Sequence, residues 1–260
     1  MAELDRVLAA RVADLHRRAE RGEITYTPFL TPAEQMELSR LYAGERDAFC
    51  FLGGYEGAER RRMFFLPPYL VGADEHLREE CLADALSECL VALEVKGSGY
   101  RDLAHRDYLG ALLHLGVERD RVGDICVISP HRAVLLCDGL MAGFFAESLT
   151  RVANDAVRIA RVTLPPDFDG GRRFLPISDT VASPRADAVV AALTNLPRER
   201  AQSLFKEGLV ELDYTPEERV DRTVAEGTVI TVRGHGKFIV RSLSDKTKKG
   251  RFRLLADKYN

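Results

Sequence analysis

Apolar residues in the first third of the chain follow the spacing of helices and short strands. They recur every three or four positions over residues 2–21, which predicts an amphipathic helix. Thr31-Pro32-Ala33-Glu34 has the form of a helix capping box, so a second helix is expected over residues 32–43. Apolar runs at 49–52 and 63–66 predict two short strands. We assign residues 1–76 to an N-terminal domain of mixed helix and strand.

From residue 77 onward the pattern alternates between strands and helices in the order β-α-β-β-α-β. The predicted elements are a strand over 89–95, a helix over 103–115, strands over 124–128 and 132–137, a helix capped by Asp138, and a strand over 156–164. This is the split βαβ order of ferredoxin-like and RNA-recognition folds, so we predict a ferredoxin-like (RRM-like) central domain over residues 77–164. The topology is common and does not by itself specify a function.

The rest of the chain divides into a predicted linker and a small C-terminal domain. Residues 165–182 contain Pro165-Pro166 and Gly170-Gly171 and are interpreted as the linker. Residues 183–260 begin with two short helices, over 185–193 and 198–207, and continue with three β stretches, over 209–212, 229–233 and 238–240. The predicted fold class is therefore α+β, with three domains.

Composition excludes several classes of protein. Hydrophobic residues make up 46% and charged residues 30% of the chain, as in ordinary globular proteins. No apolar run approaches the roughly 20 residues that a bilayer requires. The first residues are charged and lack the apolar core of a secretory signal, so we expect a cytoplasmic protein. Five cysteines without a C-x-x-C pair indicate reduced core thiols, and no metal or other cofactor is expected.

The net charge of −3 conceals an uneven distribution along the chain. Residues 183–260 hold 15 Lys and Arg against 11 Asp and Glu, a balance of +4, so the remaining residues carry −7. From Arg233 onward nine basic residues, Lys248 and Lys249 among them, face two acidic ones. Such a basic end is typical of proteins that bind polyanions; a solvated basic tail without a partner is the alternative.

The second C-terminal helix carries a candidate RNA-binding face. Arg198, Gln202 and Lys206 stand four residues apart and share this face, and Arg200 and Arg185 flank it. Cations at this spacing can contact successive phosphates, whose neutralisation dominates affinity for nucleic acids. The alternative is a solvated basic helix face.

Three stretches of the C-terminal segment resemble the S4 RNA-binding domain: Pro184–Asp187, Pro197–Leu212 and Gly227–Gly234. Pro197 stands where a serine is common, and Asp213-Tyr214 where Asn-Gly is usual. The resemblance implies an αα-turn and a small β-sheet that bind structured RNA. With the basic end, the candidate contacts in this domain are Arg185, Arg198, Arg200, Gln202, Lys206, Arg233, Lys237 and Arg241.

The remainder of the chain is similar to YlmH-type S4 proteins, a family found in bacteria and, as photosystem II S4 domain proteins, in photosynthetic lineages. The residues that carry this resemblance are Phe29–Gln35, Gly53–Arg62, His105–Leu112 and Leu115–Ile125. The family implies an N-terminal domain, a central RNA-binding domain and a C-terminal S4 domain. It also implies association with ribosomal RNA or tRNA, including large subunits blocked by a nascent chain.

Candidate contacts also occur ahead of the C-terminal segment. His105 and Arg106, near a helix start, could touch RNA phosphate, or Asp107 could cap and lock the next turn. Arg119 and Arg121 lie in a loop before a strand and are RNA candidates, with a solvated turn as the alternative. The run Arg60–Arg62 is interpreted as a solvated charge run, with phosphate contact as the second reading.

The leading hypothesis is a non-catalytic protein that docks on structured rRNA or tRNA. Its expected partner is the large ribosomal subunit, in peptidyl-tRNA rescue or quality control, with no membrane and no small-molecule substrate. Motifs for a methyl donor, a P-loop, a tRNA synthetase or a pseudouridine synthase were not found, which argues against an RNA-modifying enzyme. A protein–protein adaptor in cell division or photosystem assembly is the alternative.

Overall fold

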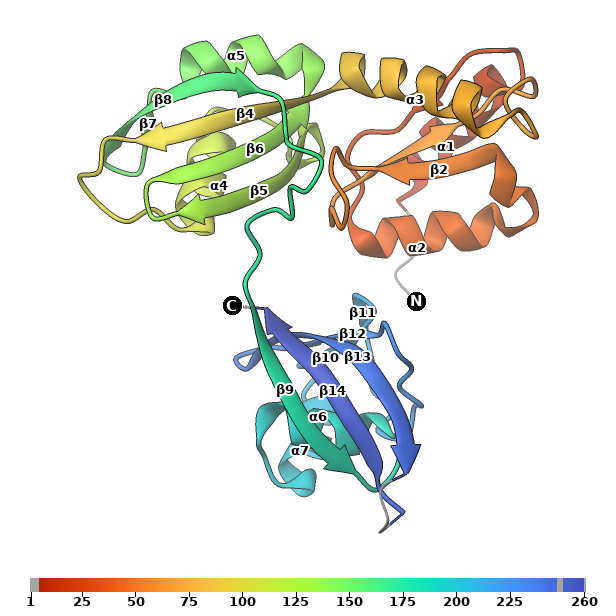
Figure 1. Cartoon of the computed structure of the whole chain (residues 1–260), viewed down its shortest axis with the longest axis vertical. Helices are drawn as coiled ribbons and strands as arrows, with labels where there is room; N and C mark the ends of the chain where they lie inside the picture. Colours follow the sequence, from red (N-terminus) through yellow and green to blue (C-terminus); the bar gives the residue numbers. More distant parts are fainter. Residues whose placement is uncertain (1–4, 247–249, 260) are drawn as a thin grey trace. The chain divides into compact units, whose positions relative to one another are not determined.

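The computed structural model describes residues 5–246 and 250–259. Its contacts divide the chain into two compact units, an N-terminal unit of residues 3–171 and a C-terminal unit that contains residues 172–260. Both units combine helices with antiparallel sheets, so the α+β class is confirmed (Figure 1). The predicted N-terminal and central domains lie together in the first of these units.

The first part of the N-terminal unit forms helices around a three-stranded sheet of order β1-β3-β2. Its elements are α1 (Arg6–Ala19), β1 (Thr25–Tyr26), α2 (Pro32–Leu41), η1 (Ala43–Ala48), β2 (Phe49–Leu52) and β3 (Arg62–Phe65). The predicted capping box begins α2. The Thr31 hydroxyl accepts a hydrogen bond from the Glu34 N–H at 3.3 Å, and the Glu34 carboxylate accepts one from the Thr31 N–H at 2.6 Å.

Helix α3 (Glu75–Cys89) was not predicted from the sequence. Its apolar residues are not confined to one face, so they give no helical period. Asp74 caps it by accepting from the His76 N–H at 2.8 Å. Leu82 and Leu86 pack against a buried cluster that includes Phe29 and Phe64.

The central sheet has the order β5-β6-β4-β8-β7, and every neighbouring pair is antiparallel. Its elements are β4 (Leu90–Gly97), α4 (His105–His114), η2 (Arg119–Arg121), β5 (Val122–Ser129), β6 (Arg132–Asp138), η3 (Gly139–Met141), α5 (Ala142–Ser148), β7 (Arg151–Val152) and β8 (Asp155–Val162). Without the two-residue β7, this strand order is that of the predicted ferredoxin-like fold.

Both faces of the central sheet are covered. Val91, Leu93 and Leu135 share one buried cluster with residues of α4 and α5. Because side chains alternate across a strand, their neighbours point to the opposite face, where Ala92 and Leu136 share a cluster with Phe29, Phe64 and parts of α3. RNA-recognition domains stack bases on an exposed sheet face, and in this unit that face belongs to the core.

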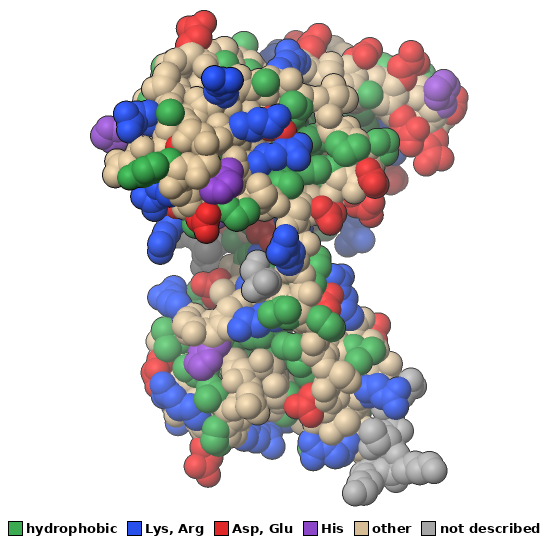
Figure 2. Space-filling model, turned by 60° about the vertical axis from the view of Figure 1, so that its left-hand side comes forward, with side chains coloured by type: hydrophobic (Ala, Val, Ile, Leu, Met, Phe, Trp, Pro, Cys, Tyr) green, Lys and Arg blue, Asp and Glu red, His purple; other side chains and the backbone are tan. Residues whose placement is uncertain are grey.

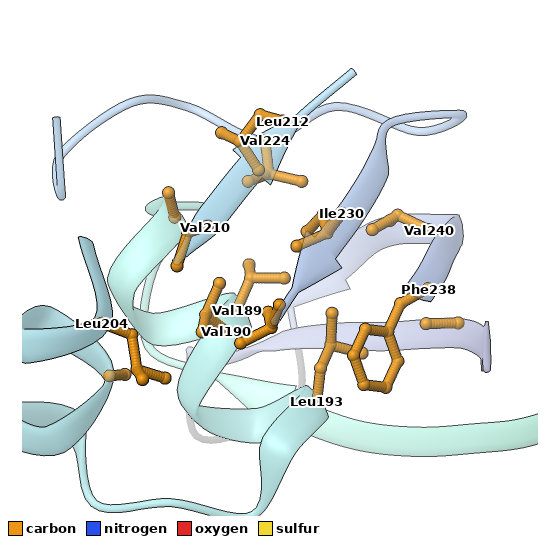
Figure 3. Packing of buried hydrophobic residues seen from close by; sticks show 14 of the residues in the cluster. Val189, Val190, Leu193, Leu204, Val210, Leu212, Val224, Ile230, Phe238 and Val240 are labelled. Atoms are coloured by element: carbon orange, nitrogen blue, oxygen red, sulfur yellow. The ribbon is translucent and has the colours of Figure 1, made fainter. Parts of the chain in front are cut away.

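The C-terminal unit contains a six-stranded antiparallel sheet of order β11-β10-β12-β13-β14-β9 and two helices. Its elements are β9 (Phe174–Val181), α6 (Ala186–Thr194), α7 (Arg198–Lys206), β10 (Val210–Leu212), β11 (Thr215–Pro216), β12 (Val229–Val232), β13 (Gly236–Lys246) and β14 (Phe252–Tyr259). Val189 and Leu204 from the helices meet Val210, Ile230 and Phe238 from the sheet in one core (Figure 3).

Three strands of this sheet were missed in the sequence, among them the two-residue β11. The second half of the segment interpreted as a linker contains strand β9, which pairs with β14 from Phe174↔Tyr259 to Val181↔Phe252. Pro176 interrupts the strand pattern in the sequence, but β9 lies at the sheet edge, where a residue without an N–H is tolerated. Strand β14 lies within the basic end, where Leu254 and Ala256 alternate toward the core.

Candidate nucleic-acid interface

A buried carboxylate organises the start of both C-terminal helices. Asp187, in the first turn of α6, is 0% exposed. Arg198, the first residue of α7, donates to it through Nε and Nη2 at 3.1 and 3.0 Å. Arg185 approaches from before α6 at 3.2 and 3.4 Å, and the Gln202 amide donates at 2.7 Å. The turn between the helices is closed by Asn195 in a left-handed conformation (φ 54°).

The negative charge of Asp187 is stabilised by its positively charged neighbours Arg185 and Arg198. Burial alone would raise the pKa of Asp187, but the hydrogen bonds from Arg185, Gln202 and Arg198 outweigh it and lower the pKa below its ordinary value. The carboxylate therefore stays ionised and holds two guanidinium groups side by side. Their side chains remain 40% and 49% exposed, so they are available to an anion from solvent.

The other predicted residues of α7 have different surroundings. Lys206 is exposed in the last helical turn, beyond Gln202. Arg200 forms an exposed ion pair with Glu207 at 2.6 Å and does not join the Asp187 cluster. The structure thus brings Arg185, Arg198 and Gln202 together and separates Arg200 from them.

The basic residues of the sheet lie on a different face from the two helices. In β13, Phe238 and Val240 point into the core, so Lys237 and Arg241 point away from it. The Lys237 ammonium lies 4.7 Å from the ring centroid of Tyr214 and 4.8 Å from that of Tyr259. Arg241 donates to Asp257 at 2.8 Å and lies over the Phe174 ring at 5.3 Å. These rings had not been predicted to share a site with cations.

Basic residues therefore occur on more than one side of the C-terminal unit. Arg233 is exposed just after β12. Figure 2 shows Lys and Arg side chains spread over the visible face of this unit, with acidic side chains between them. Lys248 and Lys249 of the predicted basic end lie outside the described residues. The charge excess is consequently a property of the whole unit rather than of one continuous patch.

Arg119 and Arg121 form hydrogen bonds within the N-terminal unit, which corrects the reading of their loop as a solvated turn. The Arg119 guanidinium donates to the carbonyl oxygens of Val122 and Gly123, the latter at 3.0 Å. Burial, assisted by the nearby charge of Arg60, lowers its pKa to about 10. Arg121 donates to Asp138 at 3.2 Å and is 35% exposed. Neither residue is a solvated loop cation, and their contact with RNA stays a prediction.

At the start of α4 the structure supports the locking role of Asp107. Its carboxylate accepts a hydrogen bond from the Ala104 N–H at 2.8 Å and fixes the helix start. His105 and Arg106 are exposed there. Partial burial and the charge of Arg119 lower the pKa of His105, which favours its neutral form. Arg106 lines an open cavity of about 550 Å³ together with His114 and Arg151.

The interpretation of Arg60–Arg62 as a solvated run is wrong for Arg60 and Arg62, while Arg61 is half-buried and lines an open pocket. Arg62 is 2% exposed, pairs with Asp138 at 2.8 Å and lies over the Phe29 ring at 4.6 Å. Arg60 donates to the carbonyl oxygens of Val122, Phe29 and Arg119 at 3.0–3.2 Å. These two arginines join the first part of the N-terminal unit to the central sheet.

Two aspartates of the central sheet, Asp124 and Asp138, also bond to residues of the first part of the N-terminal unit. Asp138 pairs with Arg62, and Asp124 accepts hydrogen bonds from the Tyr55 hydroxyl at 2.6 Å and from the backbone N–H groups of Glu59 and Arg60 at 2.8 and 2.9 Å. Burial and the Asp124 charge raise the pKa of Tyr55. The sequence predicted a capping role for Asp138. The structure confirms that role, because the Asp138 carboxylate accepts a hydrogen bond from the Leu140 N–H at 3.0 Å.

Three of the five cysteines, Cys89, Cys126 and Cys137, are buried, and Cys50 and Cys81 are half-buried. Burial raises the pKa of Cys50 and Cys89 to about 11 and that of Cys137 to about 12, which disfavours the nucleophilic thiolate. Over residues 5–246 and 250–259, no group of three His, Cys, Asp or Glu side chains could hold a metal ion. Within the same residues no helix is both long and apolar enough to span a bilayer.

The fold and these sites define an α+β protein with a ferredoxin-like central region and a basic C-terminal unit of two helices and an antiparallel sheet. The model of one protein family, described as "Putative RNA-binding domain in YlmH", matches residues 90–165. A Bacillus subtilis (strain 168) relative, "Ribosome-associated protein quality control protein P2", is 31% identical over 239 residues, which cover 90% of this chain and 87% of the relative. The chain belongs to the YlmH family.

A solved structure is also similar to part of the chain. It is "Cell division protein ylmH from Streptococcus pneumoniae", with 19% sequence identity and a TM-score of 0.46. The match covers 62% of this chain and 93% of that structure.

Proposed function

We propose that this protein is a non-catalytic, ribosome-associated RNA-binding factor that grips structured RNA through its C-terminal unit. The observation that carries the proposal is the Asp187 cluster, in which a fully buried carboxylate holds Arg185 and Arg198 side by side while both stay partly exposed. Guanidinium groups fixed in this way can bind phosphate oxygens with less loss of side-chain entropy than free arginines. Lys206 extends the cationic surface along α7.

The relative's name and the matching family model support the ribosomal setting. We further propose that the bound RNA is rRNA or tRNA and that the partner is a large ribosomal subunit, in the cytoplasm, that still holds a peptidyl-tRNA. The central sheet is covered on both faces, so the central region would contact RNA or protein through its helical side, where Arg106 and Arg151 line the open cavity.

Replacing Arg198 and Lys206 together by alanine is expected to weaken binding to structured RNA and to lower its salt dependence. Each lost phosphate contact should reduce the slope of log K against log salt concentration by ~0.7–0.9. The measurement is fluorescence anisotropy with a labelled rRNA hairpin over a salt series, using the full chain.

Arg219→Ala/Arg253→Ala is the matched control, because it also removes two positive charges from exposed positions of the same unit. It should change affinity much less. Unchanged affinity and slope in a folded Arg198→Ala/Lys206→Ala variant would show that this helix face is merely solvated.

The full-length protein is expected to sediment with large ribosomal subunits, preferentially with those that retain peptidyl-tRNA. A fragment of residues 172–260, which has its own hydrophobic core, should keep general RNA affinity but lose that preference, because specificity would require a second surface. Sucrose gradients of lysates with and without stalled translation measure both. Recovery of the full chain only in ribosome-free fractions at low salt would contradict the proposal and favour a protein–protein adaptor.

A further inference from the structure

A second cationic site lies in the N-terminal unit and shares no residue with the Asp187 cluster. Arg40 of α2, Arg46 of η1 and Arg61, which directly precedes β3, line one open pocket of about 350 Å³. Among the described residues that line this pocket, none is acidic. Three guanidinium groups that share a pocket repel one another, so their proximity favours an anion between them.

Arg61 is held in place by a buried neighbour. Its Nε donates to the side-chain oxygen of Gln35 at 2.7 Å, and its guanidinium lies 5.6 Å from the ring centroid of Phe51. Gln35 is only 3% exposed, and its amide nitrogen donates to the carbonyl oxygens of Leu30 and Glu59 at 3.1 and 2.8 Å. These two bonds fix the amide orientation, so Gln35 presents an acceptor to Arg61 and positions its planar head group.

Two acidic side chains close to the pocket residues in sequence, Glu34 and Glu45, have other partners. Glu34 accepts hydrogen bonds from the backbone and hydroxyl of Thr31. Glu45 contacts the ring of His16 at 2.9 Å. Arg40 and Arg46 are both exposed, so they can turn toward a ligand without breaking packing.

We propose that this pocket binds a phosphate group, and specifically a backbone phosphate of RNA. The guanidinium fork matches the geometry of phosphate oxygens, and the volume exceeds that of one phosphate, which leaves room for the attached sugar. The inference rests on the proposed function and extends it, because it gives the first part of the N-terminal unit an RNA contact of its own. A free phosphate-bearing small molecule is the other source of the same chemistry.

The test compares full-length Arg40→Ala/Arg46→Ala with Arg6→Ala/Arg21→Ala, a control that removes the same charge from exposed positions in and just after α1. Fluorescence anisotropy with a labelled rRNA hairpin reports affinity. We expect about ten-fold weaker binding for the pocket variant, because charge-assisted hydrogen bonds are lost, and less than about two-fold for the control. Arg198→Ala/Lys206→Ala is measured in parallel.

A second readout follows the pocket directly by NMR. The Arg61 Nε–Hε signal, assigned by its loss in Arg61→Lys, should shift when the hairpin is added. Equal RNA affinity of the pocket and control variants overturns the inference, and if Arg198→Ala/Lys206→Ala still binds weakly, the proposed function survives. A shift with inorganic phosphate at constant ionic strength but none with RNA would also overturn it and assign the pocket to a small molecule.

Discussion

Replacing Asp138 by alanine is expected to lower the free energy of unfolding of the N-terminal unit by about 3–5 kcal/mol, the usual cost of breaking a buried ion pair from one side. The side chains of Arg62 and Asp138 are 2% and 7% exposed, and their N–O distance is 2.8 Å. Alanine would leave the Arg62 guanidinium buried without its carboxylate. Urea denaturation followed by circular dichroism measures the change, and the melting temperature should fall by roughly 10 °C.

Glu23→Ala is the matched control, because it removes the acidic partner of an exposed pair of the same unit, Arg18–Glu23, with side chains 49% and 55% exposed. Exposed pairs contribute ~1 kcal/mol or less. If Asp138→Ala costs no more than Glu23→Ala, the ion pair with Arg62 is not a buried structural contact in solution.

The same pair predicts a pH dependence. Burial would raise the pKa of Asp138, but the hydrogen bond and charge of Arg62 outweigh burial and hold the pKa below its ordinary value of about 4. A lowered folded-state pKa stabilises the protein above the unfolded-state pKa, and that contribution disappears as the pH falls through the folded-state pKa. The stability difference between wild type and Asp138→Ala should therefore be full at neutral pH and shrink below about pH 4.

Asp187→Asn is expected to weaken RNA binding by roughly ten-fold even though it makes the protein more positive, because Arg185 and Arg198 lose the charge-assisted bonds that orient them. Simple electrostatics predicts the opposite sign, since removal of a negative charge should favour a polyanion. The direction of the change therefore separates positioning from charge. Anisotropy with a structured rRNA hairpin at fixed salt provides the measurement.

Glu218→Gln is the control for this variant, because Glu218 is an exposed acid of the same unit and its change adds the same charge. It should leave RNA affinity unchanged or slightly increased. Tighter binding by a folded Asp187→Asn variant, equal to that of Glu218→Gln, would mean that Asp187 only offsets charge and does not position the arginines.

Local signals in the sequence were sufficient for most of the elements that carry the sites. The capping box before α2, the β-α-β-β-α-β order and the four-residue spacing on α7 all depend on neighbours within one or two turns, and the structure confirms each. Such patterns predict elements because the same few residues both define the hydrophobic face and form the backbone hydrogen bonds.

The elements that the sequence did not predict, such as β9 and α3, depend on contacts between residues far apart in the chain. Strand β9 contains Pro176 and is stable only because β14 supplies its hydrogen bonds from 71 to 85 positions away, from the pair Val181↔Phe252 to the pair Phe174↔Tyr259. Helix α3 lacks a continuous apolar face because Leu82, Ala85 and Leu86 in its second half pack on the core, while Leu77 in its first turn is exposed. No local pattern records such contacts.

The sequence by itself determined the α+β class, the family resemblance and the basic C-terminal unit, because composition, periodicity and motif spacing are local properties. Only the tertiary structure decided what each charge does. Arg62 and Asp138 are 76 positions apart and form a buried pair, so one arginine of a run that looked solvated became part of the core. Arg185, Arg198 and Gln202 all donate hydrogen bonds to Asp187. A carboxylate that is buried away from water needs such donors, and the fold places these three side chains beside it.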